Sequence, residues 1–380
     1  MPSLRYRYSS HDVKFRSKLK KLLVQFPQHR KKILGAPFAS LPWETPLPLE
    51  HIHLPRGITT IVVCGIGGSS LGAKSITHAL SRHSVVYLNN IDPDFVQSQL
   101  AYINAKKTLF LLMSKSGETI EILSLASFLL SKIKSRKNFL LVTDNPQSSL
   151  GRLAKREKIP VLASRRNIPG RFSVLSLVGL LPPALLGLSS KNILAGARQT
   201  SWKAAYTLAA YQYLHFKNRK NVTPVFSYSE ALSPGIDWYI QLLSESIGKS
   251  KRVGITPLKA IGVKDQHAIL QLFLDGPDDK FYIFVKPEKS HHDVRIPGSR
   301  FSLQKLFDAE YLGVKSAFEK KKKPFLEISF PSISESTLGE LFFFFELEVA
   351  FLGSLFKVNY ENQPAVELSK RITKSLLAAA

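Results

Sequence analysis

Short apolar runs rich in β-branched residues recur along the chain, and each is separated from the next by a segment long enough for a helix. In the first half these runs occupy residues 59–64, 85–89, 108–113 and 139–143. A second series occupies Thr223–Tyr228, Ile255–Ile261, Phe281–Val285 and Phe325–Phe330. Alternation of strand and helix is typical of parallel sheets with right-handed crossovers. The pattern predicts an α/β fold with two doubly wound parallel-sheet sandwich domains that face one another across a cleft.

Chain length supports the same division. A chain of 380 residues exceeds the usual length of one compact domain, so two lobes with separate apolar cores are expected. The first lobe is predicted over residues 51–190, and the second over residues 191–380 with a closing helix that begins near Gln363. Residues 1–50 carry helical patterning and are expected to wrap the outside.

The apolar stretches do not predict a membrane protein. The longest, Leu177–Leu188, is interrupted by Pro182 and Pro183, and it is shorter than the roughly 20 residues that span a bilayer. The opening segment lacks the continuous apolar stretch of a secretory signal. Because Cys64 is the only cysteine, neither an internal disulfide nor a thiolate metal cage can form. A soluble, cytoplasmic protein is expected.

The charge of the chain is strongly positive. Fifty-three Lys and Arg against 28 Asp and Glu give a formal charge of +25, which attracts polyanions at low salt. One interpretation is nucleic-acid binding through runs such as Lys18–Lys21 and Lys320–Lys323. The other is a solvated cationic surface whose field also draws in small phosphorylated substrates. The basic runs are scattered and follow no zinc, recognition-helix or aromatic stacking pattern. This favours the second interpretation, and no specific nucleic-acid partner is expected.

A glycine-rich loop, Gly65–Gly72, follows the first apolar run and precedes a helical segment. Glycines let the backbone approach an anion closely, and the start of a helix adds free N–H groups, so Gly68 and Ser69 are candidate phosphate ligands. The loop lacks the lysine that ends a P-loop, and its spacing is not the dinucleotide fingerprint. A glycine turn that merely closes a strand-helix unit is the alternative.

A second candidate anion loop follows the run at 108–113. It offers three hydroxyls and one ammonium, from Ser114, Lys115, Ser116 and Thr119. The alternative is an ordinary helix cap. Two such loops at the carboxyl edge of one sheet, where open α/β folds bind ligands, strengthen the phosphate interpretation. Glu118 lies inside this loop, so it must point away from a bound phosphate or weaken its binding.

Six separated blocks make the chain similar to the glucose-6-phosphate isomerase family. In order, they are Gly65–Gly72, Ser114–Glu121, Gly170–Ser176 with Val178–Pro182, Trp238–Lys249, Asp265–Pro277 and Asn362–Lys370. The resemblance extends from about Thr59 to Leu377. It implies a double sugar-isomerase (SIS) domain fold of the flavodoxin-like type, a homodimer, and the interconversion of glucose 6-phosphate and fructose 6-phosphate with no cofactor and no metal.

The resemblance also assigns roles to individual residues. Glu245 is implied as the base that moves a proton between C1 and C2 through an enediolate. Arg171 is implied as the fixed cation that stabilises the negative charge of that intermediate. His267 and Lys370 are implied as the ring-opening residues, with His267 contributed by the neighbouring subunit. Gln363 is implied to bind near the phosphate.

Other functions remain open at this point. A bifunctional enzyme that also accepts mannose 6-phosphate would differ only in how one hydroxyl is held. A non-catalytic phosphosugar sensor would need the phosphate loops but not the four catalytic candidates together. A polyanion-binding protein would use the charge alone.

Overall fold

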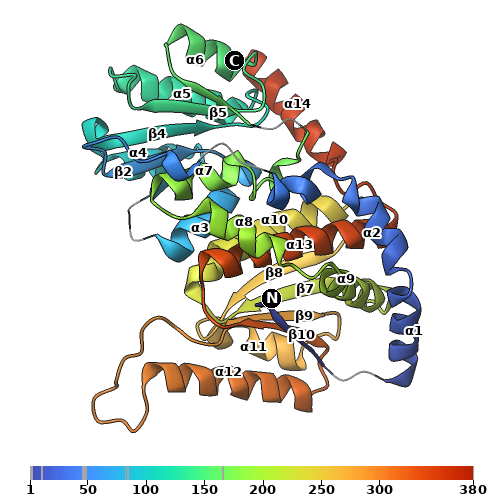
Figure 1. The fold of residues 1–380 in the computed structure, drawn as a ribbon. Coiled ribbons are helices and arrows are strands. Elements are labelled where there is room, and N and C mark those ends of the chain that lie inside the picture. Colours follow the sequence, from blue (N-terminus) through green and yellow to red (C-terminus); the bar gives the residue numbers. More distant parts are fainter. Residues whose placement is uncertain are drawn as a thin grey trace.

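The computed structural model describes residues 3–9, 12–44, 49–81, 83, 85–164 and 167–379, and it contains two five-stranded sheets stacked one above the other (Figure 1). The strands of the first sheet are β2 (Thr60–Cys64), β3 (Val85–Leu88), β4 (Thr108–Met113), β5 (Phe139–Thr143) and β6 (Val161–Ala163). Those of the second are β1 (Arg5–Tyr8), β7 (Val222–Ser227), β8 (Thr256–Ile261), β9 (Tyr282–Pro287) and β10 (Phe325–Phe330). The α/β class and all eight predicted strands are confirmed.

The strand order of the first sheet determines where a ligand can bind. The order is β3-β2-β4-β5-β6, and every neighbouring pair is parallel. The chain therefore leaves β2 in one direction to form β3 and returns to the other side of β2 to form β4. In open α/β sheets, ligands bind in the crevice at such a reversal, beyond the carboxyl ends of the strands. Both predicted phosphate loops start there, at the ends of β2 and β4.

The second sheet repeats this order and, like the first sheet with β6, has a fifth strand that the sequence did not predict. Its order is β1-β10-β9-β7-β8, in which β7 to β10 are parallel and β1 is antiparallel to β10. The N-terminal segment is thus not helical throughout. Tyr6 and Tyr8 face inward and stack on Phe344 and Tyr211, with ring centroids 5.0 Å and 4.1 Å apart.

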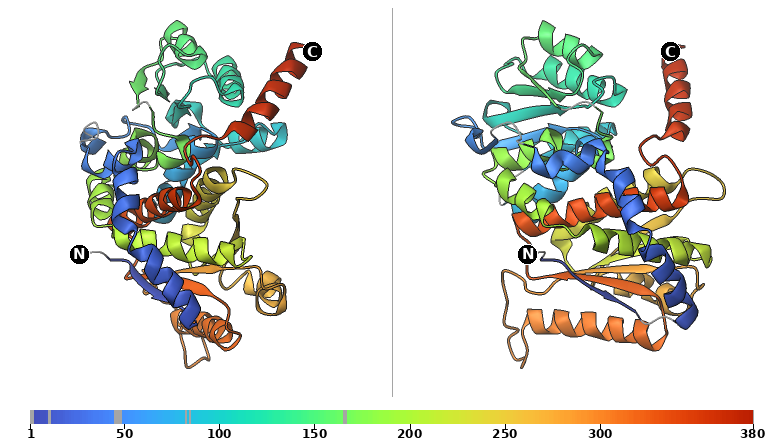
Figure 2. Two further views of the ribbon diagram at one scale, coloured as in Figure 1. Left: turned by 90° about the vertical axis from the view of Figure 1, so that its right-hand side faces the viewer. Right: turned by 45° about the vertical axis from the view of Figure 1, so that its right-hand side comes forward.

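Fourteen α-helices are found in the described part of the chain. Those before residue 190 are α1 (Val13–Leu23), α2 (Phe26–Leu34), α3 (Leu71–Leu80), α4 (Pro93–Leu100), α5 (Ile120–Lys132), α6 (Ser149–Arg156) and α7 (Leu177–Leu185). Those that follow are α8 (Ser190–Arg198), α9 (Trp202–Lys217), α10 (Ser233–Ile247), α11 (Gln266–Asp275), α12 (Leu303–Lys320), α13 (Glu335–Phe356) and α14 (Pro364–Ala378). Figures 1 and 2 show α13 crossing the middle of the molecule between the two sheets.

Each lobe has an apolar cluster of its own, as expected, but the two lobes also share a larger central core, which was not expected. Alternate residues of a strand face opposite sides of its sheet, so Val62 and Cys64 pack with α4, α5 and α6, whereas Ile61 and Val63 join the central cluster. The outer face of the second sheet packs on α11 and α12. The central cluster also contains Val225 and Ile283 of the second sheet and the apolar faces of α3, α7, α8, α9, α10 and α13. Both sheets therefore pack against the same central layer of helices.

The C-terminal helix α14 differs from all of these. It has no buried residue among those described, and Figure 2 shows it projecting from the body of the protein. In the described part of the chain, no helix combines the length and the apolar character needed to cross a membrane.

A buried carboxyl group on α13 is expected to make the stability of the protein depend on pH. Glu348 is fully buried, its Oε2 accepts a hydrogen bond from the Tyr239 hydroxyl at 3.1 Å, and burial raises the pKa of Glu348 to about 8. The unfolded chain loses this proton near the ordinary pKa of 4.5. The folded state therefore binds more protons between these values, and the free energy of unfolding falls as pH rises through that window.

Glu348→Gln should remove this dependence. We expect the variant to gain at least about 1 kcal/mol of unfolding free energy over the wild type between pH 5 and pH 8, measured by urea unfolding. Parallel stability curves for the two proteins would contradict the buried, protonated state.

Candidate active site

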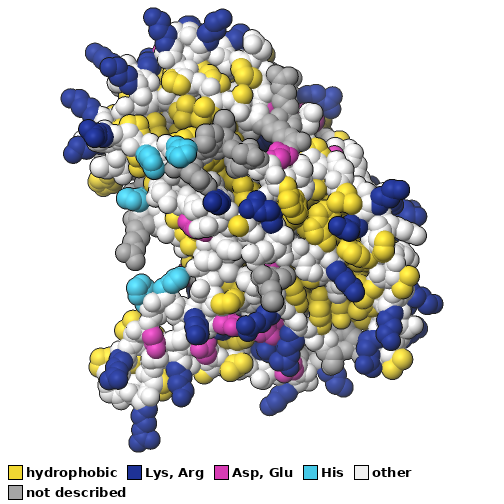
Figure 3. Space-filling view, in the orientation of Figure 1, with side chains coloured by type: hydrophobic (Ala, Val, Ile, Leu, Met, Phe, Trp, Pro, Cys, Tyr) yellow, Lys and Arg dark blue, Asp and Glu magenta, His cyan; other side chains and the backbone are white. Residues whose placement is uncertain are grey.

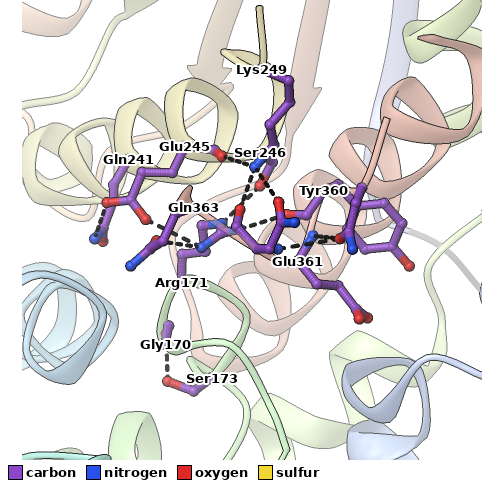
Figure 4. A network of polar contacts seen from close by, with 12 residues as sticks. Gly170, Arg171, Ser173, Gln241, Glu245, Ser246, Lys249, Tyr360, Glu361 and Gln363 are labelled. Carbon is purple, nitrogen blue, oxygen red and sulfur yellow. Dashed lines mark hydrogen bonds and ion pairs between the residues drawn. The ribbon is translucent and has the colours of Figure 1, made fainter. Parts of the chain in front are cut away.

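Arg171 lies at the centre of a buried polar network (Figure 4). A short turn, Gly170–Phe172, carries it, and its side chain is only 2% exposed. A guanidinium has five N–H groups, and all five are used: Nε donates to Ser246 Oγ (2.8 Å), Nη1 to Glu245 Oε2 (3.2 Å) and Gln363 Oε1 (2.8 Å), and Nη2 to the backbone oxygens of Tyr360 (2.5 Å) and Asn362 (3.3 Å). Burial lowers the pKa of Arg171 and Glu245 opposes the shift, but an arginine stays charged.

Glu245 occupies the last turn of α10, on the side of the helix that faces away from the core. Earlier turns of α10 bury Trp238, Tyr239 and Leu242 against the central helices, whereas the Glu245 side chain is 28% exposed. Gln241, one turn earlier on the same face, donates from Nε2 to Glu245 Oε1 at 3.0 Å. One carboxylate oxygen is thus held by an amide and the other by a guanidinium, while the group remains open to a ligand.

The glycine loop after β2 packs directly on this network. A Cβ on Gly68 would lie 2.2 Å from the carbonyl carbon of Gly170 and 2.6 Å from the backbone nitrogen of Arg171, so no side chain fits there. At Gly67, where φ is +57°, a side chain would be strained and its Cβ would lie 2.8 Å from Gln241 Nε2. The loop therefore needs glycine to bring a candidate phosphate site next to Arg171 and the helix of Glu245.

The second loop is internally braced. Ser114 Oγ donates to Thr119 Oγ1 at 3.2 Å and accepts from the backbone N–H of Gly117, and Ser116 Oγ accepts from the N–H of Glu118 at 3.2 Å. The Glu118 carboxylate accepts from Ser149, from its N–H at 2.8 Å and its hydroxyl at 2.7 Å. It therefore points toward α6, as a phosphate site in this loop requires.

Lys115 connects this loop to the arginine turn. Its Nζ pairs with Asp144 Oδ2 at 3.0 Å and donates to the backbone oxygen of Ile168, shortly before Gly170. Burial lowers the pKa of Lys115, and Asp144 opposes that shift. Lys115 thus supports the turn that carries Arg171 and places positive charge beside the two loops.

Two predicted site residues lie outside the network of a single chain. His267 is in the first turn of α11, exposed, and no contact of its ring with Arg171 or Glu245 is found among the described residues. Lys370 is 53% exposed on the projecting helix α14, and it pairs with Glu367 at 2.7 Å. Arg171, Glu245, Gln363 and Gly68 are brought together; His267 and Lys370 are not.

Three network residues had no predicted role: Gln241, Ser246 and Lys249. Gln241 lies four residues before Glu245, the spacing that places side chains on one face of a helix, whereas Lys249 lies beyond the end of α10. That spacing was the available signal. The backbone oxygens of Tyr360 and Asn362 leave no trace in a sequence, because every residue carries one.

These features define an α/β protein that can hold an anionic ligand at the switch point of one sheet, beside a carboxylate anchored by a buried arginine. The phosphoglucose isomerase profile matches residues 53–292. The glucose-6-phosphate isomerase of Carboxydothermus hydrogenoformans is 36% identical over 83% of this chain and 78% of its own length. The chain belongs to the phosphoglucose isomerase family.

Solved structures agree with this assignment. A hypothetical protein from Thermus thermophilus superposes with a TM-score of 0.90, at 30% identity, over 98% of this chain and all of its own. A glucose-6-phosphate isomerase from Chlamydia trachomatis has a TM-score of 0.84 over 99% of this chain and 89% of its own. At 20% identity the latter supports the fold alone.

Proposed function

We propose that this protein is an aldose-ketose isomerase that interconverts glucose 6-phosphate and fructose 6-phosphate in the cytoplasm. The observation that carries the proposal is the contact between Glu245 and the buried Arg171, directly beside the glycine loop. The reaction moves one proton between adjacent carbons, and protein side chains suffice for that. Family membership and the relatives' names support the same substrate pair.

Glu245 is the proposed base. It takes the proton from C2 of the open-chain aldose, which leaves an enediolate, and returns it to C1, while a second proton passes from the C2 hydroxyl to the C1 oxygen, to give the ketose. The hydrogen bonds from Gln241 Nε2 and Arg171 Nη1 fix the two carboxylate oxygens. A base held in this way does not have to be reoriented between the two proton transfers.

Arg171 is the proposed stabiliser of the enediolate. Its charge is fixed by five hydrogen bonds and lies in a buried site, where a charge acts more strongly than in water. Arg171 Nη1 contacts the carboxylate that is the proposed base. The cation therefore lies close to the carbons on which negative charge develops.

The phosphate is proposed to bind at the two loops beyond β2 and β4. Gly68 offers its backbone N–H and Ser69 its hydroxyl at the first, and Ser114, Ser116 and Thr119 offer hydroxyls at the second. Lys115 adds positive charge, and Gln363 reaches the network from the start of α14. On the face drawn in Figure 3, Lys and Arg side chains are spread over both lobes, which favours a general attraction for anions over one nucleic-acid groove.

Ring opening is proposed to require a homodimer, with His267 contributed across the interface and Lys370 brought in on α14. The separation of both residues from Arg171 in one chain supports this proposal, as does the projection of α14. An inactive Glu245→Gln subunit and an inactive His267→Ala subunit should then complement each other. After denaturation and joint refolding, half of the dimers are mixed and each has one intact site, so about a quarter of wild-type activity should return. Absence of recovery would contradict the shared site.

The function itself is tested by a coupled assay of fructose 6-phosphate conversion, with mannose 6-phosphate as a second substrate. We expect turnover of fructose 6-phosphate to glucose 6-phosphate. Binding without turnover would indicate a sensor, and salt-dependent DNA binding without turnover would indicate a polyanion-binding protein.

A further inference from the structure

Lys249 joins two parts of the site that are far apart in sequence (Figure 4). It follows Gly248, the residue at which α10 ends. Its Nζ donates to the backbone oxygen of Glu245 at 2.7 Å and to the backbone oxygen of Asn362, with Asn362 Oδ1 at 3.5 Å. Capping a helix end explains the first contact. It does not explain the second, which crosses to the segment before α14.

The Asn362 carbonyl is shared by two cations. It also accepts from Arg171 Nη2 at 3.3 Å. The next residue, Gln363, accepts from Arg171 Nη1, the nitrogen that contacts the Glu245 carboxylate. A closed ring of contacts results, from the Glu245 backbone through Lys249, Asn362, Gln363 and Arg171 to the Glu245 side chain. Loosening any one contact in the ring affects the position of the carboxylate.

The two cations differ in how firmly they hold their protons. Burial and the charge of Arg171 lower the pKa of Lys249 to about 8, while Glu245 acts in the opposite direction. Glu361 also acts on Arg171, and the Lys115–Asp144 pair lies against the segment before Gly170. A neutral amine has one N–H fewer than an ammonium and donates weaker hydrogen bonds. The contact to Asn362 therefore weakens at alkaline pH, whereas those of Arg171 do not.

We propose that Lys249 is a positioning residue for the isomerisation, which fastens the end of the helix that carries Glu245 to the segment that carries Gln363, and that it does so only while protonated. This inference rests on the proposed role of Glu245 as the base. It acts on the reaction through Glu245 and Gln363, because Lys249 is not placed at the reacting carbons.

The test is the dependence of kcat and KM on pH between 6.5 and 9.5 for the wild type, Lys249→Met and Lys249→Arg. Wild-type kcat should fall as pH rises through about 8. Lys249→Met should have a kcat about tenfold lower at pH 7, the effect of one charge-assisted hydrogen bond, with KM nearly unchanged and no fall near pH 8. Lys249→Arg keeps its charge and should move the alkaline fall to higher pH. Lys251→Met, an exposed lysine of the next turn, is the matched control and should follow the wild type.

Stability separates positioning from a merely structural role. The unfolded chain binds the Lys249 proton up to the ordinary pKa of 10.5, above the folded value of about 8. Between these values the unfolding free energy of the wild type should therefore rise with pH relative to Lys249→Met. Activity and stability should thus change in opposite directions, so unfolding cannot account for the loss of kcat near pH 8.

Two results would overturn the inference: an alkaline fall in Lys249→Met identical to that of the wild type, or a kcat equal to the wild type at pH 7. Glu245→Gln is assayed in the same series. If it too retains wild-type turnover, the proposed base is wrong; if it is inactive, the failure concerns Lys249 alone.

Discussion

Replacing Glu245 by Gln should lower kcat about a thousandfold, the usual contribution of a positioned general base, while the affinity for fructose 6-phosphate changes little. Glutamine has nearly the same shape, and its amide oxygen can still accept from Arg171 Nη1. The amide cannot accept a proton from carbon, so only the chemical step is lost. Isothermal titration with fructose 6-phosphate gives the affinity, and the coupled assay gives kcat.

Isotope exchange makes this prediction specific to proton abstraction. Deuterium at C2 of glucose 6-phosphate should be lost to water with the wild type and retained with Glu245→Gln. Glu361→Gln is the matched control, because this exposed carboxylate also acts on Arg171 but has no proposed role as a base. Rapid exchange in Glu245→Gln would show that another group removes the proton.

The second large effect is expected at Arg171. Arg171→Met should lower kcat by at least about a hundredfold, comparable to removing a preorganised donor from an oxyanion site. It also leaves four oxygens without their donor, while the Asn362 carbonyl keeps its contact with Lys249, so the free energy of unfolding should fall by several kcal/mol. Arg171→Lys keeps the charge but has three N–H groups, so we expect partial recovery of stability and little recovery of kcat.

Urea unfolding and the coupled assay together distinguish the two contributions of Arg171. Ser246→Ala removes one of the five hydrogen bonds and leaves the charge in place, so it should cost tenfold or less in kcat. A kcat for Arg171→Met no lower than that for Ser246→Ala would contradict the electrostatic role.

Much of the fold was predictable because its signals are local. In the first sheet, β2 to β5 are short and largely apolar runs, such as Thr108–Met113, which is buried at every position. The strand β1 escaped prediction because it has four residues, alternates charge with aromatic rings, and pairs with a partner about 320 positions away. The shared core was missed for a related reason. The pattern of apolar residues shows that a helix has an apolar face, but it does not show which sheet that face covers.

The site was predicted to the extent that side chains alone define it. Arg171 and Glu245 were identified through resemblance, and the structure brings them into contact. The ring through Lys249 and Asn362 depends on backbone oxygens, which are the same in every residue. The orientation of Glu118 toward Ser149 likewise depends on the placement of α6, which the sequence of the loop does not specify.

The saturation of the Arg171 guanidinium has a consequence for how a sugar can enter. With every N–H already committed to a protein oxygen, an incoming hydroxyl or enediolate oxygen can gain a hydrogen bond only by taking the place of a resident acceptor. Nη1 is where such an exchange involves partly exposed side chains, since its partners are Glu245 and Gln363. The partner of Nε is the fully buried Ser246 hydroxyl, and those of Nη2 are fixed backbone carbonyls. Binding of the substrate therefore replaces an acceptor at Arg171 Nη1 with an oxygen of the sugar. If the Glu245 carboxylate is the acceptor replaced, the group that is freed is the one that must next accept a proton.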